Sequence, residues 1–304
     1  MQIPVKYFWF ILFILNALLR VASFYTPILD VDETQFAGFA QVLMDGGLPY
    51  LNSLDTKPLG VYLFYQFCFT LFGEYNMFAV HAMTALLQFC TAYLLYLCFN
   101  LQDEKSTGKW AALFYVVFST TFFPKYIATS INSVMVVFLA LSFYFFLKAL
   151  KQKTVWHYAL AGFAVGAAFL FKYTAGIQWA LYLFILAFPL GLFWQNLQRM
   201  LIVSFAFALP FILHGLYLYN LGVWDDFALW SLLGSGKYIT QGGETISFWQ
   251  SFVLRFGAYV AATVLLWVLA GKTVWALRCH PGPSDCHPRE GGDPGRKFKN
   301  WIPA

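Results

Sequence analysis

Acidic residues gather in one short stretch of the sequence, from Asp30 to Gly60. This stretch holds five carboxylates and one lysine, although only 11% of the whole chain is charged, and long apolar runs flank it on both sides. Ionisable groups placed beside membrane-spanning segments tend to mark functional sites. The pattern therefore favours a site that faces water at a membrane surface. The alternative is a connecting loop whose charges are only solvated.

Two carboxylates, Asp32 and Glu33, directly follow the first apolar run, where an acid can meet a lipid headgroup and water together. A carboxylate held within reach of an acceptor hydroxyl can act as a general base. We expect Asp32 to take this role. Because Glu33 is its neighbour, the Glu33 side chain would point elsewhere and orient a sugar, a metal ion or the base.

Two lysines are candidate phosphate contacts. Lys57 precedes Pro58, which favours an extended residue before it and a helix after it, so Lys57 should lie at a helix end beside the membrane. An ammonium group there can stabilise a departing phosphate. Lys172 stands at the outer end of a predicted helix in which Gly162 and Gly166 allow close helix packing. For each lysine alone, the alternative is snorkelling to the membrane interface.

The elements that carry these residues are membrane helices. The 304 residues are 60% hydrophobic and 21% aromatic, which excludes an ordinary water-soluble domain. Apolar runs of about 20 residues recur along the chain, and helices satisfy their own backbone in lipid. We predict an all-α, polytopic integral membrane protein with about eight transmembrane helices. The predicted spans are residues 5–25, 77–99, 110–129, 131–149, 156–171, 175–194, 200–221 and 250–270.

The lysines also predict the orientation. The apolar run at residues 58–72 is short for a span, and if it crossed the membrane, Lys148, Lys151 and Lys153 would face outside. If it does not cross, these lysines face the cytoplasm, as the positive-inside rule requires. We therefore predict that the first loop, residues 26–76, faces outside and carries an amphipathic helix at 34–44 followed by the interfacial run. The chain would lie in a plasma membrane.

We predict one transmembrane domain, residues 1–278, with a second outer loop at 222–249 whose aromatic and charged residues suit an interface or a substrate mouth. Residues 279–304 are polar and rich in Pro and Gly, so we expect a disordered tail. This tail resembles the translated form of repeated elements found between bacterial genes, which would have replaced the end of a longer protein. The cysteines show no metal spacing, and no basic stripe indicates nucleic acid.

The order of these features resembles the GT-C class of bacterial membrane glycosyltransferases, glycosyltransferase family 39 type. Similar groups are the protein O-mannosyltransferases, the lipid A aminoarabinose transferase and the Rgt-type lipopolysaccharide sugar transferases, and the likeness extends over residues 1–221. The features that carry it are a first span, Asp32-Glu33, a short amphipathic helix, Asp55-Thr56-Lys57-Pro58-Leu59-Gly60, Leu71-Phe72-Gly73-Glu74, and the small-residue stretch from Gly162 to Gly176.

The resemblance implies transfer of a sugar from a polyprenyl-phosphate-linked donor, with inversion, on the periplasmic side of a bacterial inner membrane. The acceptor would be a lipopolysaccharide, another cell-envelope molecule or a protein. The implied site residues are Asp32 as the base, Glu33 as its partner, Lys57 and Lys172 as phosphate contacts, and Asp55 and Tyr173 as candidate contacts for the sugar or the acceptor.

The resemblance implies no definite cofactor, although a divalent cation is possible. The expected binding partners include membrane lipid and do not include nucleic acid. Two departures stand out. Relatives often carry an acid where this chain has Asn132, and they commonly continue for several more spans. One alternative is a lipid-linked sugar transporter, which would need ionisable residues deep in several spans, whereas here they gather at the outer ends. Another is an inactive, truncated glycosyltransferase.

Overall fold

The computed structural model describes residues 5–120, 127–187, 193–233, 257 and 264. The chain divides into two compact units, Met1–Lys237 and Tyr238–Ala304, and every element named below belongs to the first. Within the described residues the regular elements are helices, and no strand is present, which confirms the all-α prediction. The predicted tail at 279–304 lies outside the described residues. Of the predicted span at 250–270, only residues 257 and 264 are described.

Three helices, α4, α7 and α10, are long and apolar enough to cross a membrane, and they coincide with the spans predicted at 77–99, 131–149 and 200–221. Helices α1, α8 and α9 are shorter apolar helices, and the count of eight spans stays a prediction. The bounds are α1 (Val5–Leu19), η1 (Val21–Phe24), α2 (Val31–Met44), α3 (Gly60–Phe72), α4 (Met77–Asn100), α5 (Lys105–Phe118), α7 (Ile131–Gln152), α8 (Val155–Phe169), η2 (Tyr173–Ala175), α9 (Gly176–Ala187), α10 (Phe193–Asn220), α11 (Trp224–Phe227) and η4 (Ala228–Leu233).

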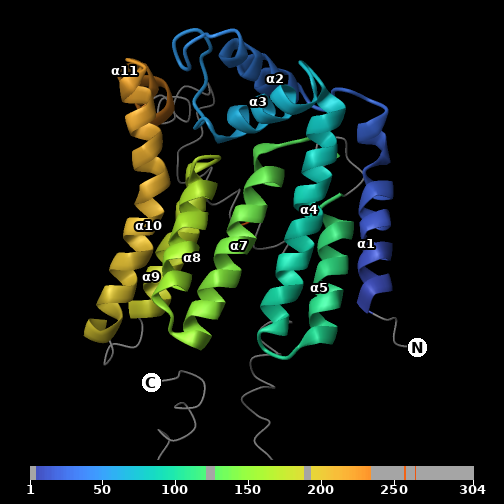
Figure 1. The fold of residues 1–304 in the computed structure, drawn as a ribbon, viewed down its shortest axis with the longest axis vertical. Coiled ribbons are helices and arrows are strands. Elements are labelled where there is room, and N and C mark those ends of the chain that lie inside the picture. The colour runs from blue at the N-terminus through green and yellow to red at the C-terminus, as the bar shows by residue number, and fades with distance from the viewer. Residues whose placement is uncertain (1–4, 121–126, 188–192, 234–256, 258–263, 265–304) are drawn as a thin grey trace, which may run out of the picture. The chain divides into compact units, whose positions relative to one another are not determined.

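The long helices stand side by side, and α2 with α3 covers one end of them (Figure 1). Helix α4 packs between α5 and α7, and α8 packs between α7 and α10, while α2 packs on α3. We call the covered end, where α4 and α7 begin, the upper end. Helix α3 has 13 residues and lies across the other helices, in agreement with a run that does not cross the membrane. Phe39 of α2 stacks on Tyr62 of α3 with ring centroids 3.9 Å apart.

Helix α2 begins earlier than the sequence predicted. The predicted start was residue 34, but the helix starts at Val31 after an extended Asp30. Carboxylates are favourable in the first turn because the N-terminal end of a helix carries partial positive charge. The predicted start at residue 34 would leave the acidic pair in the preceding loop. Asp32 and Glu33 instead lie inside the first turn of α2 and take their directions from the helix.

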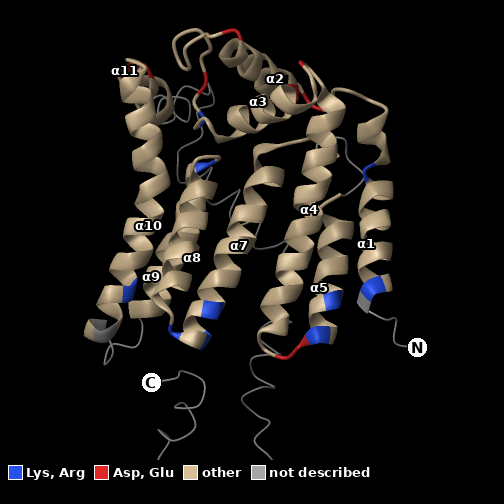
Figure 2. Cartoon of the chain, in the orientation of Figure 1, with Lys and Arg blue, Asp and Glu red and all other residues tan. Residues whose placement is uncertain are grey.

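Charged residues divide between the two ends of the helices (Figure 2). The lower end, where α1 begins and α4 ends, holds most of the described basic residues, and the upper end holds most of the described carboxylates. The lower-end basic residues are Lys6, Lys105, Lys109, Lys148, Lys151, Lys153 and Arg199; the upper-end carboxylates are Asp30, Asp32, Glu33, Asp45, Asp55, Glu74, Asp225 and Asp226.

Helices α8 and α10 approach each other closely at two glycines, as the sequence predicted for this small-residue run. A Cβ atom at Gly162 would lie 2.3 Å from the carbonyl oxygen of Val203, and one at Gly166 would lie 2.3 Å from that of Phe207. Such distances leave no room for a methyl group unless a backbone moves. The two glycines therefore fix how near α8 and α10 can come.

Replacing Gly162 by Ala should lower the free energy of unfolding by about 1 to 3 kcal/mol, because the added methyl forces α8 away from α10. Gly38→Ala is a matched control, since Gly38 lies on an exposed face of α2 with no atom within 4 Å of an added Cβ. It should be neutral or slightly stabilising. Thermal unfolding in detergent micelles compares the two variants, and equal stability for both would contradict close packing at Gly162.

Candidate active site

The two adjacent carboxylates of α2 point in different directions. Successive helix residues are rotated by about 100°, so Asp32 and Glu33 cannot share one face. Glu33 is fully buried, whereas Asp32 is half-buried and Val31 and Thr34 are exposed. Only Asp32 of the pair therefore stays open to a substrate from solvent or membrane, which is the arrangement that a general base and a separate supporting residue require.

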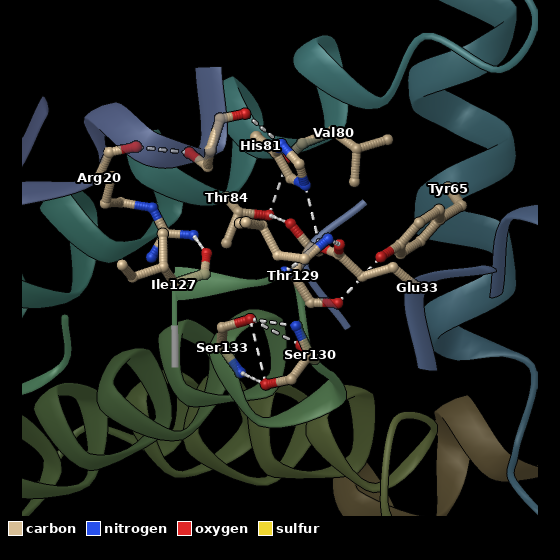
Figure 3. Close-up of polar contacts among 12 residues, drawn as sticks. Arg20, Glu33, Tyr65, Val80, His81, Thr84, Ile127, Thr129, Ser130 and Ser133 are labelled. Carbon is tan, nitrogen blue, oxygen red and sulfur yellow. Dashed lines mark hydrogen bonds and ion pairs between the residues drawn. The ribbon is translucent and has the colours of Figure 1, made fainter. Parts of the chain in front are cut away.

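The Glu33 carboxylate accepts hydrogen bonds from three separate segments, and Figure 3 shows its contacts with His81 and Thr129. The Thr129 N–H donates to Oε1 at 2.6 Å, the Leu29 N–H donates to Oε2 at 2.8 Å, and Nε2 of His81 lies 2.9 Å from Oε1. Burial alone would raise the pKa of Glu33, but these hydrogen bonds and the nearby His81 outweigh it and leave the pKa below its ordinary value. Glu33 is thus a charged anchor rather than an open ligand.

The Thr129 segment, just before α7, is held from further sides. Its carbonyl accepts from the Tyr65 hydroxyl at 2.9 Å, and its own hydroxyl lies 2.9 Å from that of Thr84. Two residues earlier, the carbonyl of Ile127 accepts from the buried guanidinium of Arg20. The start of α7 is therefore fixed to α3, α4 and the end of α1 in the same place where it receives Glu33 (Figure 3).

The Asp55 carboxylate organises the second group of candidate residues. It accepts the Gln35 side-chain amide at 2.8 Å, the Thr56 N–H at 2.6 Å and the Tyr62 hydroxyl, and it pairs with Lys57 at 3.3 Å. The Asp55 side chain is 5% exposed and that of Lys57 30%. Asp55 thus holds the lysine in place while the ammonium group stays accessible.

This segment also lies against α2. The Lys57 ammonium is 5.1 Å from the centroid of the Phe36 ring. Gln35 and Phe36 follow Asp32 by one helical turn, a rise of about 5 Å. Lys57 therefore contacts α2 about one helical turn from Asp32.

The Asp55–Gly60 segment is joined to the turn after α8 directly at Gly60 and indirectly through Ser231 of η4. The Gly60 N–H donates to the Leu170 carbonyl at 2.9 Å, so closely that a Cβ at Gly60 would lie 2.5 Å from that oxygen. The hydroxyls of Tyr173 and Ser231 lie 2.5 Å apart, and Ser231 donates to the Thr56 carbonyl at 3.2 Å. Tyr173 is thus linked through Ser231 to the segment that contains Lys57. We call these bonded segments, the Asp55–Gly60 segment and the turn after α8, the upper-end frame.

Lys172 lies in the turn that these contacts fix. Its side chain is exposed, and its ammonium donates to the Asn132 side-chain carbonyl at 3.3 Å. Because Asn132 is neutral, this contact orients the lysine without cancelling its charge. Lys57 and Lys172 therefore belong to directly bonded segments at the upper end, as a shared phosphate site requires. Among the described residues, no group of three or more His, Cys, Asp or Glu could hold a metal ion.

A family model for dolichyl-phosphate-mannose-protein mannosyltransferases matches residues 56–217, which is more than half of the chain. This chain belongs to that family. The mannosyltransferase family consists of GT-C membrane glycosyltransferases that use lipid-linked sugar donors, so the resemblance found in the sequence is confirmed. No curated protein and no solved structure matches the chain significantly.

The match to the mannosyltransferase family includes Lys57, Lys172 and Tyr173 but begins after α2. The match assigns no role to a single residue, so the roles of all six predicted site residues stay predictions: Asp32, Glu33, Asp55, Lys57, Lys172 and Tyr173. His81 was not among the predicted site residues, because a lone histidine in an apolar run is usually only hydrogen-bonded to a neighbouring helix. The need of Glu33 for a donor follows from its burial, which is visible only in the structure.

Glu33→Gln should lower the free energy of unfolding by about 2 kcal/mol at pH 7, because hydrogen bonds to a charged group are stronger than those to a neutral one. The pKa of Glu33 is lower in the folded state than in the unfolded state. Its charge therefore stabilises the fold above the unfolded pKa, and this contribution is lost as the pH falls through the folded pKa. The difference between wild type and variant should shrink in acid.

Thermal unfolding in detergent micelles over a series of falling pH values measures this difference. Glu74→Gln is the matched control because Glu74 is exposed at the upper end, so its stability should follow that of the wild type at every pH. A Glu33→Gln variant whose deficit stays constant as the pH falls would contradict a charged, hydrogen-bonded Glu33.

Proposed function

We propose that this chain transfers a sugar from a polyprenyl-phosphate-linked donor to an acceptor hydroxyl, with inversion of the anomeric carbon. The acceptor is a lipopolysaccharide, another envelope molecule or a protein. The observation that carries the proposal is the bonded frame at the upper end, in which Lys57 is held by Asp55 beside α2 and joined to the turn of Lys172. Membership of the mannosyltransferase family supports the lipid-linked donor.

In the proposed reaction, the acid and the two lysines have separate roles. Asp32 takes the proton of the acceptor hydroxyl while the oxygen of that hydroxyl forms a bond to the anomeric carbon. The bond from that carbon to the phosphate oxygen breaks, and polyprenyl phosphate leaves with the electron pair. Lys57 and Lys172 stabilise the negative charge that grows on the phosphate. Asp55 and Tyr173, which line the same frame, are the candidate contacts for the sugar or the acceptor.

The charge distribution supports the side on which the reaction takes place. Lysine and arginine are enriched in short cytoplasmic loops of membrane proteins, and the lower end is the basic one (Figure 2). We therefore assign the lower end to the cytoplasm and the upper end to the periplasm of a bacterial inner membrane. The donor then presents its phosphate at the outer surface while its polyprenyl chain stays in the lipid.

Asp32→Asn should abolish transfer while leaving expression unchanged, because the amide keeps the size and polarity of the side chain but cannot take a proton. Cells that lack the gene are complemented with wild type, Asp32→Asn or Asp45→Asn. Mass spectrometry of their envelope lipids, glycans and proteins then detects the added sugar.

The control carries the same substitution at the other end of α2, roughly 20 Å away. Asp45 caps that end and bonds the Gln41 side chain. A sugar restored by wild type and Asp45→Asn but not by Asp32→Asn is the expected result. Restoration by Asp32→Asn would reject Asp32 as the base.

A further inference from the structure

His81 is fully buried on α4 and contacts two segments that lie far away in the sequence. Its Nδ1 lies 2.6 Å from the carbonyl oxygen of Ser23 in η1, and its Nε2 lies 2.9 Å from Oε1 of Glu33 in α2. The imidazole therefore bridges the segment after α1 and the first turn of α2 (Figure 3).

Both partners of the ring are hydrogen-bond acceptors. A backbone carbonyl oxygen such as that of Ser23 can only accept, so Nδ1 must carry a hydrogen. On the other side, Oε1 of Glu33 already accepts the Thr129 N–H at 2.6 Å. The contact between Nε2 and Oε1 then requires a second proton, and because its hydrogen bonds keep the Glu33 carboxylate in its charged form, this proton belongs to Nε2. His81 and Glu33 thus form a buried, charge-assisted pair, in which position 81 has to donate on both sides.

We propose that His81 is a positioning residue for sugar transfer, which acts through Glu33 on the direction of Asp32. The inference rests on the proposed function for its catalytic part. Asp32 and Glu33 are adjacent in the first turn of α2, so a shift of the anchored side chain moves its neighbour. A displacement of about 1 Å at a reacting group can reduce the rate on the order of 100-fold.

The environment of Glu33 explains why His81 is needed in addition to the two backbone donors. Glu33 is fully buried, and the N–H groups of Leu29 and Thr129 supply hydrogen bonds but no net positive charge. Removing the imidazole leaves each carboxylate oxygen with a single hydrogen-bond partner in a buried position, which favours movement of the turn towards water. The first turn of α2 is the part that can move, because it carries this carboxylate.

The test compares three variants of the full chain. His81→Phe keeps a planar ring and removes both donors. His81→Arg supplies donors to both acceptors and a positive charge. The matched control is His214→Phe, since His214 is also a buried histidine and its ring nitrogens have no hydrogen-bond partner among the described residues.

Two readouts separate positioning from simple loss of stability. The first is kcat and KM of sugar transfer to the acceptor that complementation identifies. The second is hydrogen exchange of the Leu29 and Thr129 amides, which donate to Glu33, compared with the Lys153 amide, which bonds Ala149 at 2.8 Å at the lower end. Both are measured on protein that is folded in detergent micelles.

His81→Phe should lower kcat by about 100-fold with little change in KM, and it should speed exchange at Leu29 and Thr129 but not at Lys153. His81→Arg should recover a large part of kcat, and His214→Phe should match the wild type. Unchanged kcat and exchange in His81→Phe would overturn the proposal. An equal loss of kcat in His81→Phe and His81→Arg, with faster exchange also at Lys153, would overturn the proposal as well, because that pattern indicates general destabilisation.

A wild type that transfers no sugar would remove the proposed function itself. The exchange pattern then decides whether His81 positions the first turn of α2. Selective loss of protection at Leu29 and Thr129 would support that link, and an unaltered pattern would reject it.

Discussion

The buried carboxylate of Glu33 is the constraint on which the upper end depends. A carboxylate removed from water must receive hydrogen bonds and a balancing charge, or its burial is very costly. Here the donors are the Leu29 and Thr129 amides and His81, which come from the loop before α2, the start of α7 and α4. One side chain therefore fixes three segments relative to α2, and no segment can leave without exposing or isolating the charge.

The other contacts of the upper end build on this fixed helix. Through Gln35 and Phe36, α2 supports Asp55 and Lys57, and Gly60 then joins α3 to the turn after α8. Below, close approach at glycines ties α8 to α10. The segments that carry Asp32, Lys57 and Lys172 are thus linked to one another, and none of these three side chains is fully buried. Catalysis by positioned groups requires this combination of rigid support and accessible side chains.

Apolar runs and charge bias predicted much of this arrangement, because membrane helices need length and apolar composition, which are visible locally in a sequence. They gave α4, α7, α10 and the short apolar α3, and motif order gave the family. The sequence did not give the start of α2, since neighbouring carboxylates are compatible with either a loop or a first helical turn. Nor could it give the partnership of Glu33 with His81, because 48 residues separate them and only the tertiary fold brings the two side chains together. The links from Ser231 to Thr56 and Tyr173 were missed for the same reason.

Release of polyprenyl phosphate is the most direct measure of the proposed activity. The full-length chain is reconstituted in liposomes with polyprenyl-phosphate-linked sugars and an envelope fraction that supplies acceptors, and mass spectrometry follows the free polyprenyl phosphate and the acceptors. We predict that free polyprenyl phosphate rises in step with an acceptor that gains the mass of one sugar. No release above that of liposomes without the protein would contradict sugar transfer by this chain.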